Sequence, residues 1–547
     1  MTTTDAVTTT DWWRTAVIYQ VYPRSFADSD GDGVGDLRGV TARFDALAEL
    51  GADAVWLSPF MTSPQRDAGY DVADYCDVDP LFGSLADFDA LLAAAHDRGI
   101  RIIVDLVPNH SSIDHPWFQE ALAAGPGSPE RERYVFRDGG GVDGELPPNN
   151  WTSVFGGPAW TRITEADGTP GPWYLHIFDT SQPDFDWSNP WVHDRFREIL
   201  RFWLDRGVDG FRVDVAHGLV KAEGLPDYTP APAGGSMGGH EALAPYWGQE
   251  GVHEVYREWR KVLDEYDAER VLIAEAWVMP LSRMAHWVRE DEMHQAFNFG
   301  YLETPWDAEK LRTIVDESLT AFGGVGAPST WVLSNHDVIR HTTRLALVPP
   351  PPQGEGIGPR SPRADEVVGL RRGRAATAFM LALPGSAYLY QGEELGLPEV
   401  VDLPDEVRQD PTFHRTAGQS YGRDGCRVPI PWEADAPAAG FSPTGASWLP
   451  QPAAWPSYAR DTQRGVPEST LEFYRAALAA RREYGLGAGS IEWLDGGGHV
   501  LAFRNGDLTV VANTGPTPVP LPAGEVVLSS GPVGEGLLPG DTTAWLR

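Results

Sequence analysis

Short apolar runs that end in polar residues recur along this chain. Seven are clear, over residues 17–22, 54–58, 102–106, 208–215, 271–275, 331–335 and 387–391, and a weaker one lies at 296–299. Near-continuous apolar runs of this kind are typical of strands covered on both faces, as in parallel sheets. The pattern therefore predicts eight buried parallel strands.

Helical patterns with recognisable ends separate these runs. Ser84 caps an expected helix that Gly99 closes, and Asn189-Pro190 opens another that ends before Gly207. Strands that alternate with helices at this spacing predict a (β/α)8 TIM barrel. Its active site is expected at the carboxyl ends of the strands, where the polar residues of each run lie.

Two segments depart from this alternation. Residues 110–186 are rich in Gly, Pro, Asn and Trp, and we expect them to form an irregular B domain inserted after the third strand. From residue 485 the pattern becomes strictly alternating, which predicts a C-terminal antiparallel β-sandwich domain. The expected organisation is a disordered tail at 1–11, a barrel from 12–109 and 187–484, the insertion at 110–186, and the C-terminal domain at 485–547.

The composition narrows the class of partner. The 43 basic and 78 acidic residues give a formal charge of −35, which argues against nucleic acid and anionic membranes and fits a small neutral substrate. Cys76 and Cys426 form no disulfide framework. With no signal peptide or membrane span visible, we expect a cytoplasmic protein, either a monomer or a homodimer.

Arg212 and Asp214 stand two positions apart in the run 208–215 and would project from the same face of a strand. A guanidinium there is expected to lower the pKa of the carboxyl and keep it ionised, as a carboxylate nucleophile requires. The alternative is an ordinary buried ion pair. Further carboxylates and histidines end other runs, and such crowding is destabilising unless it is used. These residues are Asp105, Asn109, His110, Glu275, Asn335, His336 and Asp337.

Four ordered motifs connect the chain to a known family. They are DLVPNH at 105–110, GFRVD at 210–214, AEAW at 274–277 and SNHD at 334–337, with supporting matches at 18–26, 389–396 and 422–432. On these motifs the chain resembles the α-amylase superfamily (family 13) of glycoside hydrolases, in its α-glucosidase and oligo-1,6-glucosidase branch. The resemblance covers residues 12–485.

The resemblance implies a role for each strand-end residue. Asp214 would be the nucleophile, Glu275 the general acid/base, and Asp337 the carboxylate that stabilises charge on the distorted sugar. His110 and His336 would hydrogen-bond sugar hydroxyls. A retaining double displacement follows from this pair of carboxyls.

The segment at 66–71 resembles the stretch that closes the family's pocket around the non-reducing glucose. Asp67 would bind its far hydroxyls and Tyr70 would stack under the ring. Arg427 would pair with Asp67, although Arg423 lies in the same motif. A closed pocket implies exo attack that releases one glucose at a time.

Residues 28–36, with sequence DSDGDGVGD, place aspartates at alternate positions on a glycine-rich turn. Such oxygen ligands suit Ca2+, with Mg2+ as another candidate, although Gly39 occupies the position where an EF-hand has its glutamate. In the resembled branch this loop binds a structural Ca2+ through Asp28, Asp30, Asp32, the Val34 carbonyl and Asp36. The alternative is an Asx-rich turn without a metal.

The motifs give conflicting indications of which glycosidic linkage the protein prefers. In the resembled family Val215, just after the proposed nucleophile, favours α-1,6 linkages, whereas Asp186 and Ala216-His217 depart from the oligo-1,6-glucosidase pattern. We expect an α-glucosidase that prefers maltose and small malto-oligosaccharides. The alternatives are an oligo-1,6-glucosidase and an isomerising or transglycosylating relative, such as trehalose synthase or sucrose isomerase. A non-catalytic transporter ectodomain would lack the carboxylates, and a calcium-regulated binding protein would rest on one incomplete loop.

Overall fold

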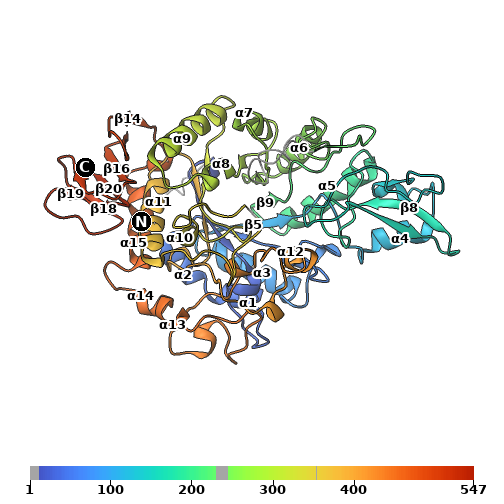
Figure 1. Cartoon of the computed structure of the whole chain (residues 1–547), viewed down its shortest axis with the longest axis horizontal. Helices are drawn as coiled ribbons and strands as arrows, with labels where there is room; N and C mark the ends of the chain where they lie inside the picture. The colour runs from blue at the N-terminus through green and yellow to red at the C-terminus, as the bar shows by residue number, and fades with distance from the viewer. Residues whose placement is uncertain (1–10, 230–243, 353) are drawn as a thin grey trace, which may run out of the picture.

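The computed structural model describes residues 11–229, 244–352 and 354–547 (Figure 1). The predicted tail at 1–11 lies outside the described residues, apart from Asp11. A barrel occupies the centre of the molecule, an inserted segment projects from one side, and an antiparallel sheet covers the opposite side. Among the described helices, none combines the length and the apolar character needed to cross a membrane.

Eight strands form the central sheet in the order β11-β10-β9-β5-β2-β1-β13-β12, and all neighbours are parallel. They are β1 (Val17–Val21), β2 (Ala54–Leu57), β5 (Arg101–Leu106), β9 (Gly210–Val213), β10 (Val271–Ala274), β11 (Gln295–Ala296), β12 (Thr330–Val332) and β13 (Ser386–Tyr390). The outer strands meet where the Asn298 N–H donates to the Thr330 carbonyl at 3.3 Å. The sheet thus closes into a near-complete ring, and the predicted (β/α)8 barrel is confirmed.

Both faces of the barrel strands are buried, which explains their unbroken apolar sequences. On β5, Ile103 packs inside the barrel in one cluster with Trp56 and Tyr388, whereas Ile102 and Val104 belong to the larger cluster beneath the helices. Successive side chains alternate between the two clusters because strand residues point to opposite faces.

The weakest predicted strand, at 296–299, is shorter than expected. Strand β11 ends at Ala296, and the Asn298 side chain accepts a hydrogen bond from the Tyr301 N–H at 3.0 Å. This cap starts helix α8 (Phe299–Glu303). The last residues of the predicted strand therefore belong to the helix and its cap.

Helices surround the barrel, and the predicted caps are present. The Ser84 hydroxyl accepts from the Asp87 N–H at 3.3 Å, and Asn189 accepts from the Trp191 N–H at 3.0 Å. Gly207 follows the second of these helices with a φ of 102°, which glycine adopts without strain. The longer helices are α2 (Phe44–Leu50), α3 (Leu85–His96), α5 (Pro190–Asp205), α6 (Val252–Leu263), α9 (Ala308–Gly323), α11 (Glu366–Leu381) and α15 (Thr470–Glu483).

The inserted segment lies between β5 and α5 and projects away from the C-terminal sheet (Figure 1). It contains helix α4 (Pro116–Ala124) and a three-stranded antiparallel sheet in the order β6-β8-β7. The strands are β6 (Phe136–Arg137), β7 (Trp160–Thr164) and β8 (Pro170–Leu175). A bridge between His110 and Asp184 joins its two ends, so the segment leaves the barrel and returns at one point.

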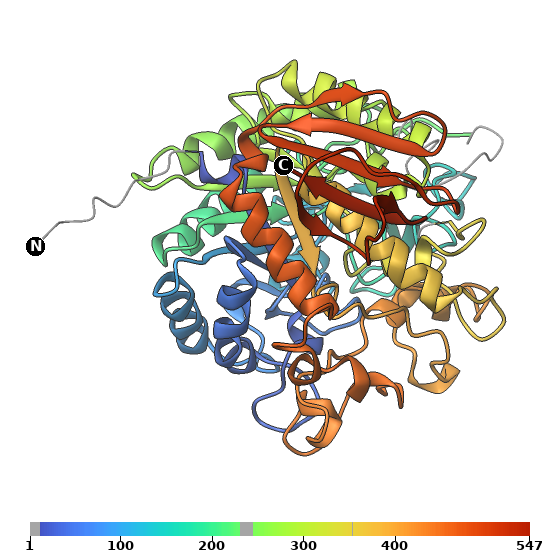
Figure 2. The ribbon, with the colours of Figure 1, turned by 90° about the vertical axis from the view of Figure 1, so that its left-hand side faces the viewer.

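The C-terminal part is antiparallel, with a five-stranded sheet in the order β14-β15-β16-β20-β18 and a two-stranded sheet of β17 and β19. Their bounds are β14 (Glu492–Leu494), β15 (Val500–Asn505), β16 (Leu508–Asn513), β17 (Val519–Pro520), β18 (Val526–Ser529), β19 (Leu537–Leu538) and β20 (Thr542–Leu546). The larger sheet packs on α11 and α15, where Phe503 meets Phe379 and Trp545 donates to the Ala378 carbonyl (Figure 2). The carboxyl ends of the barrel strands remain uncovered by this sheet.

Candidate active site

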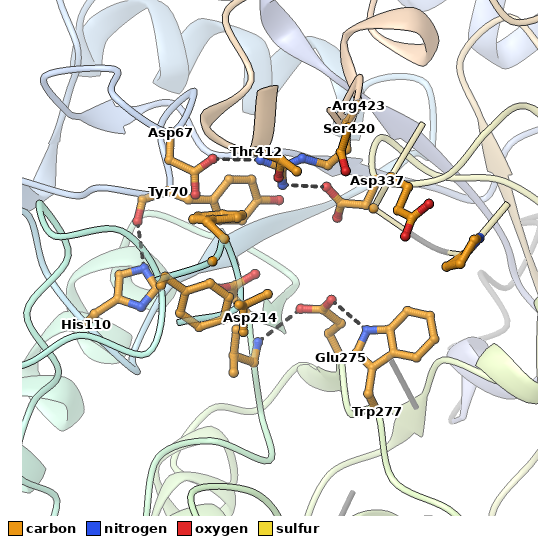
Figure 3. Close-up of a pocket in the computed structure, with 18 of the residues that line it drawn as sticks. Asp67, Tyr70, His110, Asp214, Glu275, Trp277, Asp337, Thr412, Ser420 and Arg423 are labelled. Carbon is orange, nitrogen blue, oxygen red and sulfur yellow. Dashed lines mark hydrogen bonds and ion pairs between the residues drawn. The ribbon is translucent and has the colours of Figure 1, made fainter. Parts of the chain in front are cut away.

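A cavity of ≈370 Å³ opens at the carboxyl ends of the barrel strands. The structure brings six predicted site residues together in its lining: Asp67, Tyr70, His110, Asp214, Glu275 and Asp337 (Figure 3). Three more predicted site residues stand behind that lining, where Arg212, His336 and Arg427 are at most 2% exposed. These three act on the lining carboxylates and rings rather than forming the cavity surface.

Arg212 is the centre of the first cluster of charges. It extends from β9 and reaches Asp105 and Asp214 through Nη1 at 2.8 and 2.7 Å. Its Nη2 lies 2.8 Å from Glu275, which follows β10. Three neighbouring strand ends therefore converge on one guanidinium, and the two cavity-facing carboxyls, of Asp214 and Glu275, are held side by side.

The protonation of Asp214 differs from the prediction. Burial raises the pKa of the Asp214 carboxyl well above its usual range, Arg212 opposes that rise, and Glu275 and Asp105 add to it. Arg212 lowers the pKa of Asp214 as predicted, but burial, together with the nearby Glu275 and Asp105 carboxyls, outweighs that effect, so the net shift is upward. Asp214 and Glu275 are held on the same guanidinium, Asp214 at 2.7 Å from Nη1 and Glu275 at 2.8 Å from Nη2 of Arg212.

Val215 positions the Glu275 carboxyl. Its φ of 46° is a rare conformation for a β-branched residue and costs on the order of 1–3 kcal/mol. The turn ends β9 at Val213 and aims the Val215 N–H at Glu275 Oε2, 3.0 Å away. Trp277 Nε1 donates to the other oxygen at 3.3 Å. The sequence pattern, which extended the strand to residue 215, gave no sign of this strained turn.

A second cluster of charges closes the far end of the cavity. Arg423 Nη2 lies 2.9 Å from Asp67, Nη1 lies 3.0 Å from Asp337, and Nε lies 2.6 Å from Asp410. Burial raises the pKa of Asp67 to about 6, although Arg423 opposes this. The arginine that joins the two cavity carboxylates is therefore Arg423.

The predicted pairing of Arg427 with Asp67 is wrong. Arg427 instead contacts Asp337 at 2.9 Å and donates from Nε to the His336 carbonyl at 2.8 Å. The short 3-10 turn η7 (Asp424–Cys426) separates the two arginines and sends Arg423 into the cavity and Arg427 behind it. Burial favours the neutral form of Asp337, but His336, Arg423 and Arg427 together hold its pKa well below the usual range.

Tyr70 forms the floor of the cavity. Its ring stacks on His336 with centroids 5.4 Å apart and planes at 1°, and its hydroxyl donates to Asp105 at 3.1 Å. His110 contacts the Tyr70 carbonyl at 3.1 Å (Figure 3). Burial lowers the pKa of His336 well below its usual value and that of His110 to about 4, so both imidazoles are neutral near pH 7. Neutral rings suit hydrogen bonds to hydroxyl groups.

Sequence reasoning missed the residues that join the inserted segment to the barrel. Lys221 Nζ lies 2.8 Å from Asp184 and donates to Asn109 at 2.8 Å. Across the mouth, Arg415 lies 3.0 Å from Asp179. The sequence did contain one indication of this contact, a lysine within the apolar run 219–222. A buried ammonium requires a carboxylate partner, so this lysine could have predicted an ion pair.

The mouth of the cavity is aromatic. Phe155, Phe178, Trp247 and Trp277 line it, and Trp277 stacks on Phe299 with centroids 3.6 Å apart. Rings in this position exclude water and offer flat surfaces to a second sugar or another acceptor. Their tryptophan-rich and phenylalanine-rich segments were visible in the sequence, but the spacing did not show that they converge.

The aspartate loop at 28–36 lies away from the cavity. Asp28, Asp30 and Asp36 place carboxylate oxygens within 4.8 Å of one another, as ligands of one cation would be. Asp32 is outside this group and accepts from the Val34 N–H at 2.7 Å. Asp28 accepts from the Gly31 and Gly33 N–H groups at 2.7 and 2.9 Å, so the turn is already ordered by its own backbone.

Comparison with known proteins identifies the family of the chain. Residues 20–488 match the family model described as "Alpha amylase, catalytic domain". The chain belongs to the α-amylase family of glycoside hydrolases, in the branch of α-glucosidases and oligo-1,6-glucosidases. The family prediction is thereby confirmed.

Two curated relatives cover most of the chain. A probable α-glucosidase of Rhizobium meliloti is 40% identical over 90% of this chain and 87% of its own length. An oligo-1,6-glucosidase of Parageobacillus thermoglucosidasius is 34% identical over 86% of this chain and 84% of its own length.

Solved structures give the same fold. A crystal structure of the α-glucosyl transfer enzyme XgtA has a TM-score of 0.85 at 36% identity, covering 98% of this chain and all (100%) of its own. A mutant of the trehalulose synthase MutB, in complex with Tris, has a TM-score of 0.83 at 30% identity over 98% of this chain and 100% of its own. Enzymes named for α-glucosyl transfer and for trehalulose synthesis thus share this architecture.

Proposed function

We propose that this protein is a retaining, exo-acting α-glucosidase. It would release α-D-glucose from the non-reducing end of short α-glucosides, with maltose and small malto-oligosaccharides preferred. The observation that carries the proposal is the pair of carboxyls, Asp214 and Glu275, held by Arg212 at one wall of a cavity whose far end is closed by Asp67 and Arg423.

The proximity of the two carboxyls supports retention of configuration. Inverting enzymes keep their carboxyls about 6.5–9.5 Å apart to admit a water, whereas retaining enzymes hold them at about 5–5.5 Å. Asp214 and Glu275 both lie against the Arg212 guanidinium, at 2.7 and 2.8 Å, which supports the shorter spacing. Asp214 would attack the anomeric carbon while Glu275 gives its proton to the leaving oxygen. Glu275 would then accept a proton from water, whose oxygen displaces Asp214.

The far end of the cavity supports exo attack. Asp67 and Asp337 present carboxylate oxygens fixed by Arg423, and Tyr70 lies between them as a flat floor. We infer that a single glucose ring would bind between these groups and the Asp214–Glu275 pair, with the ion pairs of Arg423 at the closed end. Asp337 is held ionised, as a carboxylate that binds hydroxyls and stabilises a positive sugar ring should be.

A second candidate reaction is glucosyl transfer or sucrose isomerisation at the same pair. The observation in its favour is the aromatic mouth formed by Phe155, Phe178, Trp247 and Trp277, which would hold an acceptor and exclude water. The structural similarity to a transfer enzyme and a trehalulose synthase points the same way. Product analysis on maltose, isomaltose and sucrose separates transfer products from free glucose.

The test of the main proposal uses two isosteric variants and one control. Asp214→Asn removes the nucleophile and Glu275→Gln removes the transferable proton, so each should lower kcat on maltose about 10²–10⁴-fold or more. Asp138→Asn changes an exposed carboxylate of the inserted segment and should leave kcat unchanged. NMR of the glucose first released from an aryl α-glucoside, whose leaving group is not a sugar, should show the α anomer. Near wild-type turnover in either site variant, or β-glucose as the first product, would overturn the proposal.

We further propose that the loop at 28–36 binds a structural Ca2+, with Mg2+ as a weaker substitute. Asp28, Asp30 and Asp36 would hold it, with Asp32 and the Val34 carbonyl completing the shell, and the ion would neutralise the crowded carboxylates. Chelation should lower the melting temperature, and Ca2+ should restore it. Asp30→Asn should abolish that response. A melting temperature indifferent to both chelator and Ca2+ would show a turn that needs no metal.

A further inference from the structure

A group of metal-ligand side chains lies outside the cavity and outside the aspartate loop. Glu250, His253 and His286 bring one ligand atom each to within 4.8 Å of the others. His253 stands in the first turn of α6, and His286 lies in the 3-10 helix η5 (Ala285–Val288). His253 is 2% exposed, His286 is half-buried and Glu250 is exposed, so the group opens to solvent on one side.

The buried member, His253, has a fixed orientation. Its Nδ1 lies 2.6 Å from Oε2 of Glu292, a carboxylate that is fully buried. Glu292 is also paired with Arg257 at 2.9 Å and Arg289 at 3.0 Å. Because a carboxylate oxygen accepts, the ring nitrogen that faces it, Nδ1, carries the N–H of this contact.

The consequence is a free lone pair on the other ring nitrogen. With Nδ1–H donating to Glu292, Nε2 of His253 is an acceptor, and no hydrogen bond reaches it from the part of the chain that the structure describes. A carboxylate behind an imidazole is the arrangement that orients metal-binding histidines and raises their basicity. A mere ion pair between His253 and Glu292 would leave the approach of His286 and Glu250 unexplained.

We propose that Glu250, His253 and His286 bind a divalent transition-metal ion of the zinc class. Two imidazoles and one carboxylate are ligands that zinc favours, whereas calcium and magnesium take oxygen. Ligand bonds of about 2.0–2.2 Å require ligand atoms about 3.4 Å apart in a tetrahedral site. Small rotamer changes of the exposed Glu250 and the half-buried His286 close the remaining gap, and the fourth position stays open to water.

The bound ion would connect η5 with α6, two elements that contact the turn after Asp214. Trp287, next to His286, donates from Nε1 to the Ala216 carbonyl at 3.1 Å, and Tyr256, one turn after His253, also donates to that carbonyl. Ala216 is two residues beyond Asp214. An ion that ties η5 to α6 therefore fixes both supports of this turn, and its binding should raise the melting temperature. This inference is independent of the substrate proposed above.

The experiment titrates the full-length, chelator-treated protein with ZnCl2 by calorimetry, with excess Ca2+ present to saturate the aspartate loop. Co2+ serves as a second probe, because a site with nitrogen ligands gives it visible absorption bands. The expected result is one ion per chain and a higher melting temperature with Zn2+. His286→Ala and Glu250→Gln, both at accessible positions, should each weaken binding at least tenfold and remove the Zn2+-dependent shift in melting temperature.

His499→Ala is the matched control, since it removes an exposed histidine from the C-terminal sheet region and should bind Zn2+ like the wild type. Circular dichroism and the melting temperature without metal establish that each variant is folded. Unchanged Zn2+ affinity in both His286→Ala and Glu250→Gln would overturn the inference. So would the absence of stoichiometric Zn2+ or Co2+ binding by the wild type.

Discussion

The cavity contains two buried clusters of ionic side chains that differ in charge balance. The proposed catalytic cluster sets one guanidinium, Arg212, against the carboxyls of Asp105, Asp214 and Glu275. The end cluster sets two guanidiniums, Arg423 and Arg427, against the carboxyls of Asp67, Asp337 and Asp410. Fully ionised, the catalytic cluster would carry one more negative charge than the end cluster.

This difference contributes to the pKa values of the carboxyls in the two clusters. Burial raises the pKa of Asp214, and the only guanidinium beside it, that of Arg212, is shared with two other carboxyls. In the end cluster burial acts in the same direction, but the added positive charge holds the pKa values of Asp337 and Asp410 below their usual range. Two cations thus keep Asp337 and Asp410 ionised, although burial still raises the pKa of their neighbour Asp67 to about 6.

Removing Arg212 should have the largest effect. Arg212→Met leaves three buried carboxylates without a cation, so unfolding free energy should fall by roughly 3–5 kcal/mol. The acid limb of the kcat/KM profile should also move to higher pH, because the Asp214–Glu275 pair loses its stabilising charge. Denaturant unfolding and pH–rate profiles measure the two effects.

Arg131→Met provides the control for that variant. Arg131 is equally buried and paired with Glu165 at 3.0 Å, but it lies in the inserted segment away from the cavity. It should lose stability without moving the pH profile. A profile that stays in place in Arg212→Met would contradict the role assigned to its charge.

Arg423→Lys should reduce activity by about two orders of magnitude. Lysine keeps the charge but cannot bridge Asp67 and Asp337 at once, and two hydrogen bonds to charged groups contribute roughly 3 kcal/mol together. The loss should fall mainly on KM for maltose. Arg427→Lys, which does not touch Asp67, should raise KM less, and equal effects of the two variants would argue against Arg423 as the bridging residue.

Two substitutions within the end cluster should have opposite effects on stability. Asp67 has a folded pKa of about 6 against a usual value of 3.8, so its contribution to stability is lost as pH rises from about 4 to 6. Asp67→Asn should therefore be more stable than the wild type at pH 8, by at most about 3 kcal/mol. Asp337 has a lowered pKa and stabilises the fold above pH 4, so Asp337→Asn should be less stable there.

Melting curves at pH 5 and pH 8 test this pair of variants. Both should lose substrate binding, which distinguishes the stability effect from the functional one. Destabilisation of both variants at pH 8 would mean that Asp67 is ionised at no cost in the folded protein.

Val215→Thr should have the smallest effect and should concern specificity. The backbone turn and its N–H to Glu275 are kept, while a methyl group at the cavity wall becomes a hydroxyl. The ratio of kcat/KM for isomaltose to that for maltose should fall, by about tenfold at most. The pH profile of the catalytic pair should stay unchanged, and a shifted profile would show that Val215 does more than contact the substrate.

The sequence was sufficient to predict the barrel because strands buried on both faces need apolar residues at every position. The strand-end residues Asp214, Glu275 and Asp337 converge because parallel strands bring their carboxyl ends to one edge. Periodicity describes these regular parts of the chain and little else. It failed at Asn298, where a local cap overrode an apolar run.

Side-chain partners in irregular segments were beyond prediction. Arg423 and Arg427 have similar sequence surroundings, and only the turn between them decides which one reaches Asp67. The positive φ of Val215 also escaped notice, since nothing in a run of apolar residues signals a left-handed valine. The shift in the pKa of Asp214 depends on how many carboxylates share Arg212. The sequence does not show this number, because the carboxylates come from different strands.

The lysine that joins the inserted segment to the barrel has a consequence for how the enzyme is handled. Lys221 supplies a positive charge between Asp184 and Asn109 from a covalently attached side chain. That charge cannot dissociate into the medium, so the wall of the cavity built on Asp184 should withstand dilution and chelating buffers alike. Substitution of Lys221, rather than a reagent that sequesters ions, is the change expected to loosen it.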